Sequence, residues 1–252
     1  MQHQPLLLAF ETATAAASVA LLRGDSLIAV RALPAERPAS ETLLPSVIAL
    51  LAEAGVALAA IEAFAVSVGP GSFTGLRVGV ATVKGLAFGG DAAVVAVPTL
   101  AALALRAMPA PGPIAALLDA RRGEVYVAIH DGDPADPPRV GPVVLRPEAL
   151  VEVLAGFGAE SAFTLIGEGV GVVADAMRDH FGDRLRWLPP PHGLPDAVAV
   201  GRLGARLLDA GAGSTADALA PVYVRRAEAE VQRTGERFEL PLRRFDTPGN
   251  VS

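Results

Sequence analysis

The sequence predicts an α/β protein of two lobes, each a mixed β-sheet with flanking helices. Short, β-leaning apolar runs alternate with segments of helical periodicity, the pattern of sheets that are covered by helices. Hydrophobic residues make up 52% of the 252 residues and aromatic residues only 5%, so Ala, Val and Leu must build the core. The segment 108–113, Met-Pro-Ala-Pro-Gly-Pro, is the clearest linker in the chain. We therefore predict an N-terminal lobe over residues 1–108 and a C-terminal lobe over residues 113–226.

The N-terminal lobe opens with three strands joined by turns and continues with helices and strands in alternation. Turn residues such as Gly24-Asp25 separate the strands, and a continuous apolar face marks each helix. The predicted strands are 6–10, 18–22, 27–32, 63–68 and 94–97, and the predicted helices are 40–55, 74–88 and 99–107.

The C-terminal lobe has a similar mixture, beginning with a hairpin whose turn is Asp119-Ala-Arg-Arg-Gly123. The predicted strands are 114–118, 124–130, 143–145, 163–166 and 185–188, and the predicted helices are 147–154, 172–181 and 197–210. The last helix could pack back on the first lobe. Residues 227–252 are polar and mixed in charge, which predicts a mobile tail.

The segment from Ser67 to Gly89 is the most distinctive stretch of the chain. Gly69-Pro70-Gly71 ends a strand in a tight turn, and Ser72 or Thr74 can cap the helix that follows. Glycine inside a helix costs about 1 kcal/mol relative to alanine, so the glycines of this helix need a reason. Packing inside the domain would supply one, and so would the close approach of a partner's backbone.

Three motifs carry a resemblance to a known family. The sequence G-P-G-S-F-T-G-L-R-V-G, followed by K-G-L-A, resembles the signature of the TsaB (YeaZ) family, and D-A-R-R-G-E-V-Y and P-V-Y-V-R resemble two further motifs of that family. The resemblance extends from Leu6 to about Arg226. It implies the two-lobed fold of the actin-like ATPases (ASKHA), whose opening of strand, small polar turn, strand, turn and strand this chain shares.

The resemblance also implies a function in tRNA modification. Members of this family are non-catalytic dimerisation subunits of the bacterial machinery that makes threonylcarbamoyladenosine at position 37, in tRNAs reading codons that start with A. They pair with TsaD, which transfers the threonylcarbamoyl group, and an ATPase, TsaE, joins the complex. ATP or ADP can lie at the subunit junction, although the subunit itself requires no cofactor. A homodimer is possible in isolation, and tRNA would be contacted indirectly through the complex.

The helices 40–54 and 74–88 are the expected partner surface. The first has an apolar stripe wider than one sheet contact requires, and the second has glycines four residues apart, which suits close helix packing. The predicted interface residues are Leu43, Leu44, Val47, Leu51, Gly75, Val78, Gly79, Thr82 and Leu86.

A second set of residues could lie near a nucleotide, because actin-like ATPases hold phosphates at the first strand turn. These residues are Glu11, Thr12, Thr14, Ser72, Thr74 and Arg77. Here the turn reads Glu-Thr-Ala-Thr where the family begins with Asp-Thr-Ser-Thr, and Ala39 stands where the family usually has a histidine. A polar loop without a ligand is therefore an alternative interpretation of this turn.

Several other functions have little support in the sequence. The chain has no cysteine and no phosphate-binding P-loop. Its four histidines lack the spacing of metal ligands, and we expect them to be exposed. Ser72 lacks the flanking glycines of a nucleophile elbow, so a glycoprotease-like activity is not predicted. The net charge of −6 argues against a free-standing RNA-binding protein. We expect a cytoplasmic protein without a signal peptide or membrane span; the alternative function is an active ATPase or kinase of the actin-like fold.

Overall fold

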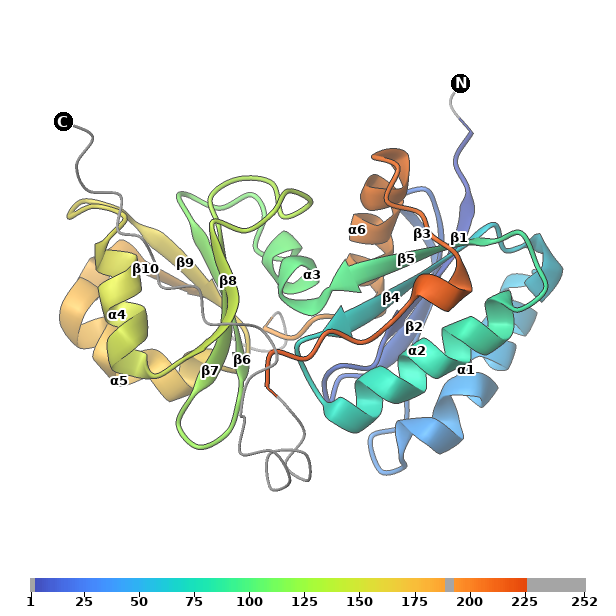
Figure 1. Cartoon of the computed structure of the whole chain (residues 1–252), viewed down its shortest axis with the longest axis horizontal. Coiled ribbons are helices and arrows are strands. Elements are labelled where there is room, and N and C mark those ends of the chain that lie inside the picture. Colours follow the sequence, from blue (N-terminus) through green and yellow to red (C-terminus); the bar gives the residue numbers. More distant parts are fainter. Residues whose placement is uncertain (1–2, 189–192, 226–252) are drawn as a thin grey trace.

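The computed structural model describes residues 3–188 and 193–225, and these form two lobes that lie side by side (Figure 1). In the described residues the first lobe contains a five-stranded sheet with the order β3-β2-β1-β4-β5. β1 pairs antiparallel with β2 and parallel with β4, so the sheet is mixed. Its strands are β1 (Leu6–Glu11), β2 (Ser18–Arg23), β3 (Ser26–Ala32), β4 (Ala63–Gly69) and β5 (Ala93–Pro98).

The sheet of the second lobe repeats this topology within the described part of the chain. Its order is β10-β9-β6-β7-β8, so both sheets have the order 3-2-1-4-5 when the strands of each are counted along the chain. The strands are β6 (Ile114–Asp119), β7 (Val125–His130), β8 (Val140–Leu145), β9 (Phe163–Ile166) and β10 (Leu185–Leu188). This duplicated α/β arrangement confirms the predicted actin-like fold of two mixed sheets with flanking helices.

Helices cover both faces of each sheet because the strands are apolar on both sides. Along β1, Leu6, Leu8 and Phe10 face one core, which includes α1 (Ala39–Ala54) and α2 (Phe73–Ala87). The alternate residues Leu7 and Ala9 face α6 (Ala197–Asp209). In the second lobe, α4 (Pro147–Ala155) and α5 (Val170–Phe181) cover one face of the sheet.

The last helix of each lobe contacts the other lobe. α3 (Thr99–Leu105) follows β5 and lies between the lobes: Ala101 and Ala102 pack in the first-lobe core, whereas Leu100 and Leu103 pack with Ile114 and Ile166 of the second sheet. α6 follows β10 of the second lobe and packs on the first sheet, and Ser214 then bridges to Val94 of β5. The last helix of the predicted C-terminal lobe, residues 113–226, therefore packs back on the first lobe, which the sequence left open. The predicted tail, 227–252, lies outside the described residues.

Three short 3-10 helices, Leu58–Ala60, Gly182–Arg184 and Ala216–Ala218, complete the elements of the described chain. No helix within residues 3–188 and 193–225 is both long and apolar enough to cross a membrane.

Candidate functional site

A cavity of about 220 Å³ lies between the lobes, where the loops after several strands meet. Thr14 and Ser72 line it from the first lobe, and Asp119, Arg121 and Glu168 line it from the second. Thr14 and Ser72 belong to the set of residues predicted to lie near a nucleotide. The cavity is polar and contains groups of both charges.

The loop after β1 owes its shape to a buried carboxylate beneath it. Glu11 is fully buried, and its Oε1 accepts hydrogen bonds from the backbone N–H groups of Ala13 at 2.6 Å and Thr14 at 3.1 Å. Its Oε2 has no hydrogen-bond partner among the described residues. Burial raises the pKa of Glu11 to about 7, against the lowering effects of the nearby Ser67 hydroxyl and of the N–H groups of Ala13 and Thr14. Glu11 therefore supports the loop from below and does not line the cavity.

Thr12, Thr74 and Arg77 of the predicted set do not line the cavity, and Ser72 has a structural role besides lining it. Thr12 is buried against α2, and Thr74 is exposed in the first turn of that helix. Ser72 Oγ accepts the backbone N–H of Gly75 at 3.2 Å, so this hydroxyl caps α2. The guanidinium of Arg77 lies over the Phe73 ring and donates to the Tyr223 hydroxyl at 3.1 Å.

The second-lobe wall of the cavity is the β6–β7 turn. Asp119 Oδ1 accepts the backbone N–H of Arg121 at 2.7 Å, and Arg121 and Arg122 adopt the left-handed conformation that the turn requires. Burial, followed by the nearby charge of Asp119, raises the pKa of Glu168. Two carboxylates, Asp119 and Glu168, thus face the cavity beside the Arg121 guanidinium. Because the carboxylates carry negative charge, this lining does not favour the binding of a polyphosphate without a counterion.

The three sequence motifs, far apart in the chain, meet at the junction of the lobes. The segment Pro221–Arg225 carries the third motif: Val222 donates its N–H to the Val68 carbonyl at 2.7 Å, and the ring centroid of Tyr223 lies 4.8 Å from that of Phe73. At its other end Arg225 donates to the Ala120 carbonyl at 2.7 Å and pairs with Glu124. The closing segment therefore connects the first motif in one lobe to the second motif in the other.

The glycines of the first motif are required by packing inside the chain. A Cβ on Gly75 would lie 2.0 Å from the Thr12 carbonyl oxygen, and one on Gly79 would lie 2.3 Å from Thr12 Oγ1. Both glycines are buried. Their assignment to the partner surface is wrong, because the β1–β2 loop already occupies the space that they leave open.

Part of the predicted surface on α1 is also wrong. Leu43, Val47 and Leu51 are buried in the core of the first lobe, whereas their neighbours Leu44 and Ile48 are 48% and 61% exposed. On α2, Val78, Thr82 and Leu86 are half-buried, and Phe88 just beyond the helix is 88% exposed. α1 and α2 lie next to each other on one side of the lobe (Figure 1). We call the set Leu44, Ile48, Val78, Thr82, Leu86 and Phe88 the helical face, although Val78 and Leu86 also pack against the first-lobe core.

Comparisons with known proteins agree with the family resemblance that these motifs carry. The family model described as "TsaD: tRNA N6-adenosine threonylcarbamoyltransferase" matches residues 33–176, more than half of the chain. A crystal structure described as an uncharacterized protein with similarity to peptidase YEAZ from Pseudomonas aeruginosa is 34% identical, with a TM-score of 0.74, and the match covers 88% of this chain and 100% of the other. "YeaZ from Pseudomonas aeruginosa" is also 34% identical, with a TM-score of 0.70, over 87% of this chain and 99% of the other.

Curated relatives named "tRNA threonylcarbamoyladenosine biosynthesis protein TsaB" show a similar level of identity. The protein from Haemophilus influenzae is 41% identical over 48% of this chain and 51% of its own length. The one from Escherichia coli is 40% identical over 50% of this chain and 55% of its own length. The chain belongs to the TsaB/YeaZ family. Its alignments span about half the length of these curated relatives.

Two features of this TsaB/YeaZ chain escaped prediction. Ile48 and Phe88 belong to the helical face, and the spacing of four residues from Leu44 to Ile48 is the signal that could have indicated Ile48. The link through Arg225 has no local signal, because it joins residues about a hundred positions apart.

We predict that Arg225→Met lowers the free energy of unfolding by about 1–2 kcal/mol. Arg225 and Glu124 are each about one fifth exposed, so the cost falls below that of breaking a fully buried pair. Urea denaturation measures the change. Arg186→Met is the control, since Arg186 is exposed on the edge strand β10 of the second lobe. Equal stability of Arg225→Met and the wild type would show that the link contributes nothing.

Proposed function

We propose that this chain is a non-catalytic subunit in the biosynthesis of tRNA threonylcarbamoyladenosine, and that it pairs with a TsaD-like subunit through the helical face. The observation that carries the proposal is the full-length likeness to the YeaZ structure, together with the curated relatives named for this biosynthesis. In the proposed complex the TsaD-like partner transfers the threonylcarbamoyl group to adenosine 37, and a TsaE-like ATPase joins it.

The exposed apolar residues support a protein partner for α1 and α2. Leu44, Ile48 and Phe88 are large, apolar and 48–88% exposed, and they lie on adjacent elements. Exposed apolar surface of this kind is typical of protein interfaces. The half-buried Val78, Thr82 and Leu86 would complete the contact at its centre.

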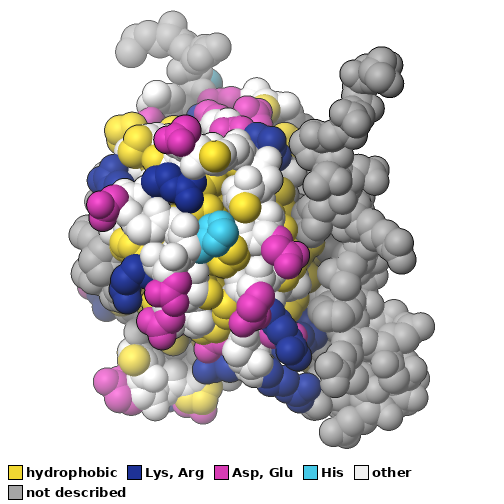
Figure 2. Space-filling view, turned by 90° about the vertical axis from the view of Figure 1, so that its left-hand side faces the viewer, with side chains coloured by type: hydrophobic (Ala, Val, Ile, Leu, Met, Phe, Trp, Pro, Cys, Tyr) yellow, Lys and Arg dark blue, Asp and Glu magenta, His cyan; other side chains and the backbone are white. Residues whose placement is uncertain are grey.

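The charge of the chain supports an indirect contact with tRNA. The net charge is −6, whereas phosphate contacts require a basic surface. On the outer end of the second lobe, basic and acidic side chains are interspersed around apolar ones (Figure 2). We therefore propose that the partner supplies most of the contact with tRNA.

The lining of the interlobe cavity is consistent with a subunit that does no chemistry itself. Ser72 Oγ caps a helix, and Glu11 is buried beneath its loop. Among the residues that the structure describes, no three His, Cys, Asp or Glu side chains form a group that could hold a metal ion. A nucleotide would then bind at the junction with the partner, if at all, and an active ATPase or kinase is the rival function.

Leu44→Asp should weaken binding to the TsaD-like subunit of the same organism by about 30-fold, because a charge would be buried in the contact. Co-expression, gel filtration and light scattering establish whether a 1:1 complex forms, and titration calorimetry gives its affinity. Met108→Asp is the matched control, since Met108 is 44% exposed but lies away from the helical face.

Two outcomes would count against this function. Separate elution of the two proteins, even with tRNA and ATP present, would remove the basis of the scaffold role. Steady hydrolysis of ATP by the isolated chain would favour the rival ATPase.

A further inference from the structure

A second cavity, of about 250 Å³, lies between the lobes and shares no lining residue with the first. α3 and the ends of β4 and β5 form one side of it, and β7, the segment 134–138 and Pro142 of β8 form the other. The walls are almost entirely apolar, and six of the lining residues are prolines: Pro70, Pro98, Pro134, Pro137, Pro138 and Pro142. Because the proline ring fixes φ, these residues restrict the backbone conformations around the cavity.

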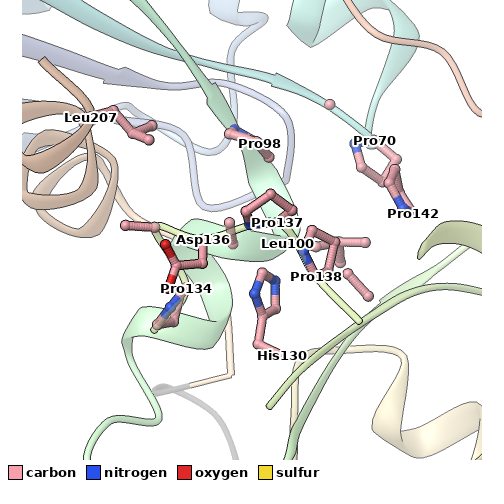
Figure 3. A pocket seen from close by; sticks show the side chains of 14 residues that line it. Pro70, Pro98, Leu100, His130, Pro134, Asp136, Pro137, Pro138, Pro142 and Leu207 are labelled. Carbon is pink, nitrogen blue, oxygen red and sulfur yellow. The ribbon is translucent and has the colours of Figure 1, made fainter. Parts of the chain in front are cut away.

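His130 is the polar group inside this apolar cavity. Its side chain points toward the middle of the pocket, among the prolines of the 134–138 segment (Figure 3). The residue is only 2% exposed, and neither ring nitrogen has a hydrogen-bond partner among the described residues. A buried polar group without a partner destabilises a fold, so a molecule that bonded to this ring would gain affinity.

His130 is neutral at physiological pH. Burial lowers its pKa to about 4, and the charge of Asp133 opposes this shift only in part. The Asp133 carboxylate is itself paired with Arg206. A neutral imidazole presents one N–H donor and one nitrogen acceptor, so it can bond to a hydroxyl group or an N–H group.

The charge and size of the cavity restrict what can enter it. Its charged lining residue among those described is Asp136, which is exposed at the rim and would repel an anion. An apolar cavity of about 150 Å³ binds benzene in another protein, so 250 Å³ accommodates one aromatic ring with a substituent. A lone water molecule fits poorly, since it needs two to four polar partners and the walls offer few.

We propose that this cavity is a binding site for a small uncharged aromatic molecule with one hydroxyl or N–H group, oriented by a hydrogen bond to the His130 ring. The site is independent of the function proposed above, since it lies apart from both the first cavity and the helical face. Residues of both lobes form its walls, so an occupant would stabilise their observed arrangement.

Phenol and benzene are the probes that test this site, because they differ by one hydroxyl. Each is titrated into the full ¹⁵N-labelled chain at pH 7.5, and the imidazole nitrogens of His130 are observed by NMR. We expect saturable shifts of these nitrogens and a dissociation constant about fivefold lower for phenol than for benzene. The anion 4-hydroxybenzoate should not bind.

Variants distinguish the contribution of the His130 hydrogen bond from that of the volume of the cavity. His130→Phe keeps a ring of similar size without nitrogens, and it should remove the preference for phenol. His180→Phe is the control, because His180 is exposed on α5 and should leave both affinities unchanged. If His130→Phe does not fold, Leu207→Trp tests the site instead, since a larger side chain at this wall should block both probes.

The proposal would be overturned by any of three results: no saturable shift of the His130 nitrogens, equal affinities of the wild type for phenol and benzene, or an unchanged preference for phenol in His130→Phe.

Discussion

Gly75→Ala should lower the free energy of unfolding of the isolated chain by about 3 kcal/mol, the upper part of the range for overpacked sites. The new methyl group would lie 2.0 Å from the Thr12 carbonyl oxygen. This oxygen cannot move aside by a side-chain rotation, because it belongs to the backbone. The loop that carries it is held by the hydrogen bonds from Ala13 to Glu11 and from Ser72 to Ala13.

Gly85→Ala on the same helix is the matched control. Gly85 is exposed, and a Cβ there would have no atom within 4 Å. Alanine should therefore stabilise the helix by about 1 kcal/mol, its ordinary advantage over glycine. Urea denaturation of both variants measures the two changes, which have opposite signs. If the Gly75→Ala chain is as stable as the wild type but does not bind the TsaD-like subunit, Gly75 belongs to the partner surface after all.

Gly79→Leu follows the same reasoning and corrects the first interpretation of the motif. The sequence alone left open whether these glycines admit a partner helix or the chain's own loop. Because Thr12 occupies the space beside Gly79, leucine should destabilise the first lobe itself. Loss of pairing in this variant would then follow from unfolding.

The elements of the fold could be predicted from the sequence because their signals are local. The predicted strand 63–68 differs by one residue from β4 (Ala63–Gly69). The predicted helix 74–88 differs by one residue at each end from α2 (Phe73–Ala87). Glycine and proline mark these boundaries directly. The packing of α3 and α6 against the opposite lobe has no such signal, since an apolar helix face does not specify which sheet it covers.

The candidate site was less predictable, for a related reason. Leu43 and Leu44 are adjacent and chemically identical, yet one is buried and the other is 48% exposed. A wide apolar stripe does not show which of its residues face the core and which face a partner until the orientation of the helix on the sheet is known. His130 is a similar case: it ends a predicted strand, where an exposed histidine was expected, but the segment 134–138 and α3 enclose it.

Glu11→Gln should stabilise the chain at pH 8 by up to about 3 kcal/mol and have little effect at pH 4. Burial raises the pKa of Glu11 from 4.5 to about 7, so the folded chain holds a proton that the unfolded chain has released between these values. The contribution is therefore fully present below pH 4.5 and is lost as the pH rises through 7. Glutamine is neutral throughout, and its carbonyl oxygen can still accept the N–H groups of Ala13 and Thr14.

The measurement is urea denaturation of both chains from pH 4 to pH 8, and the quantity that matters is the difference between them. His130 has the opposite effect, because its pKa falls from 6.5 to about 4 and its contribution is lost as the pH falls. Since both chains contain His130, its contribution cancels in the difference between their free energies of unfolding. Glu160→Gln is the control at an exposed position and should show no such trend. A constant difference between Glu11→Gln and the wild type would mean that the pKa of Glu11 is the same in the folded and unfolded chains, and that its carboxyl group is open to water.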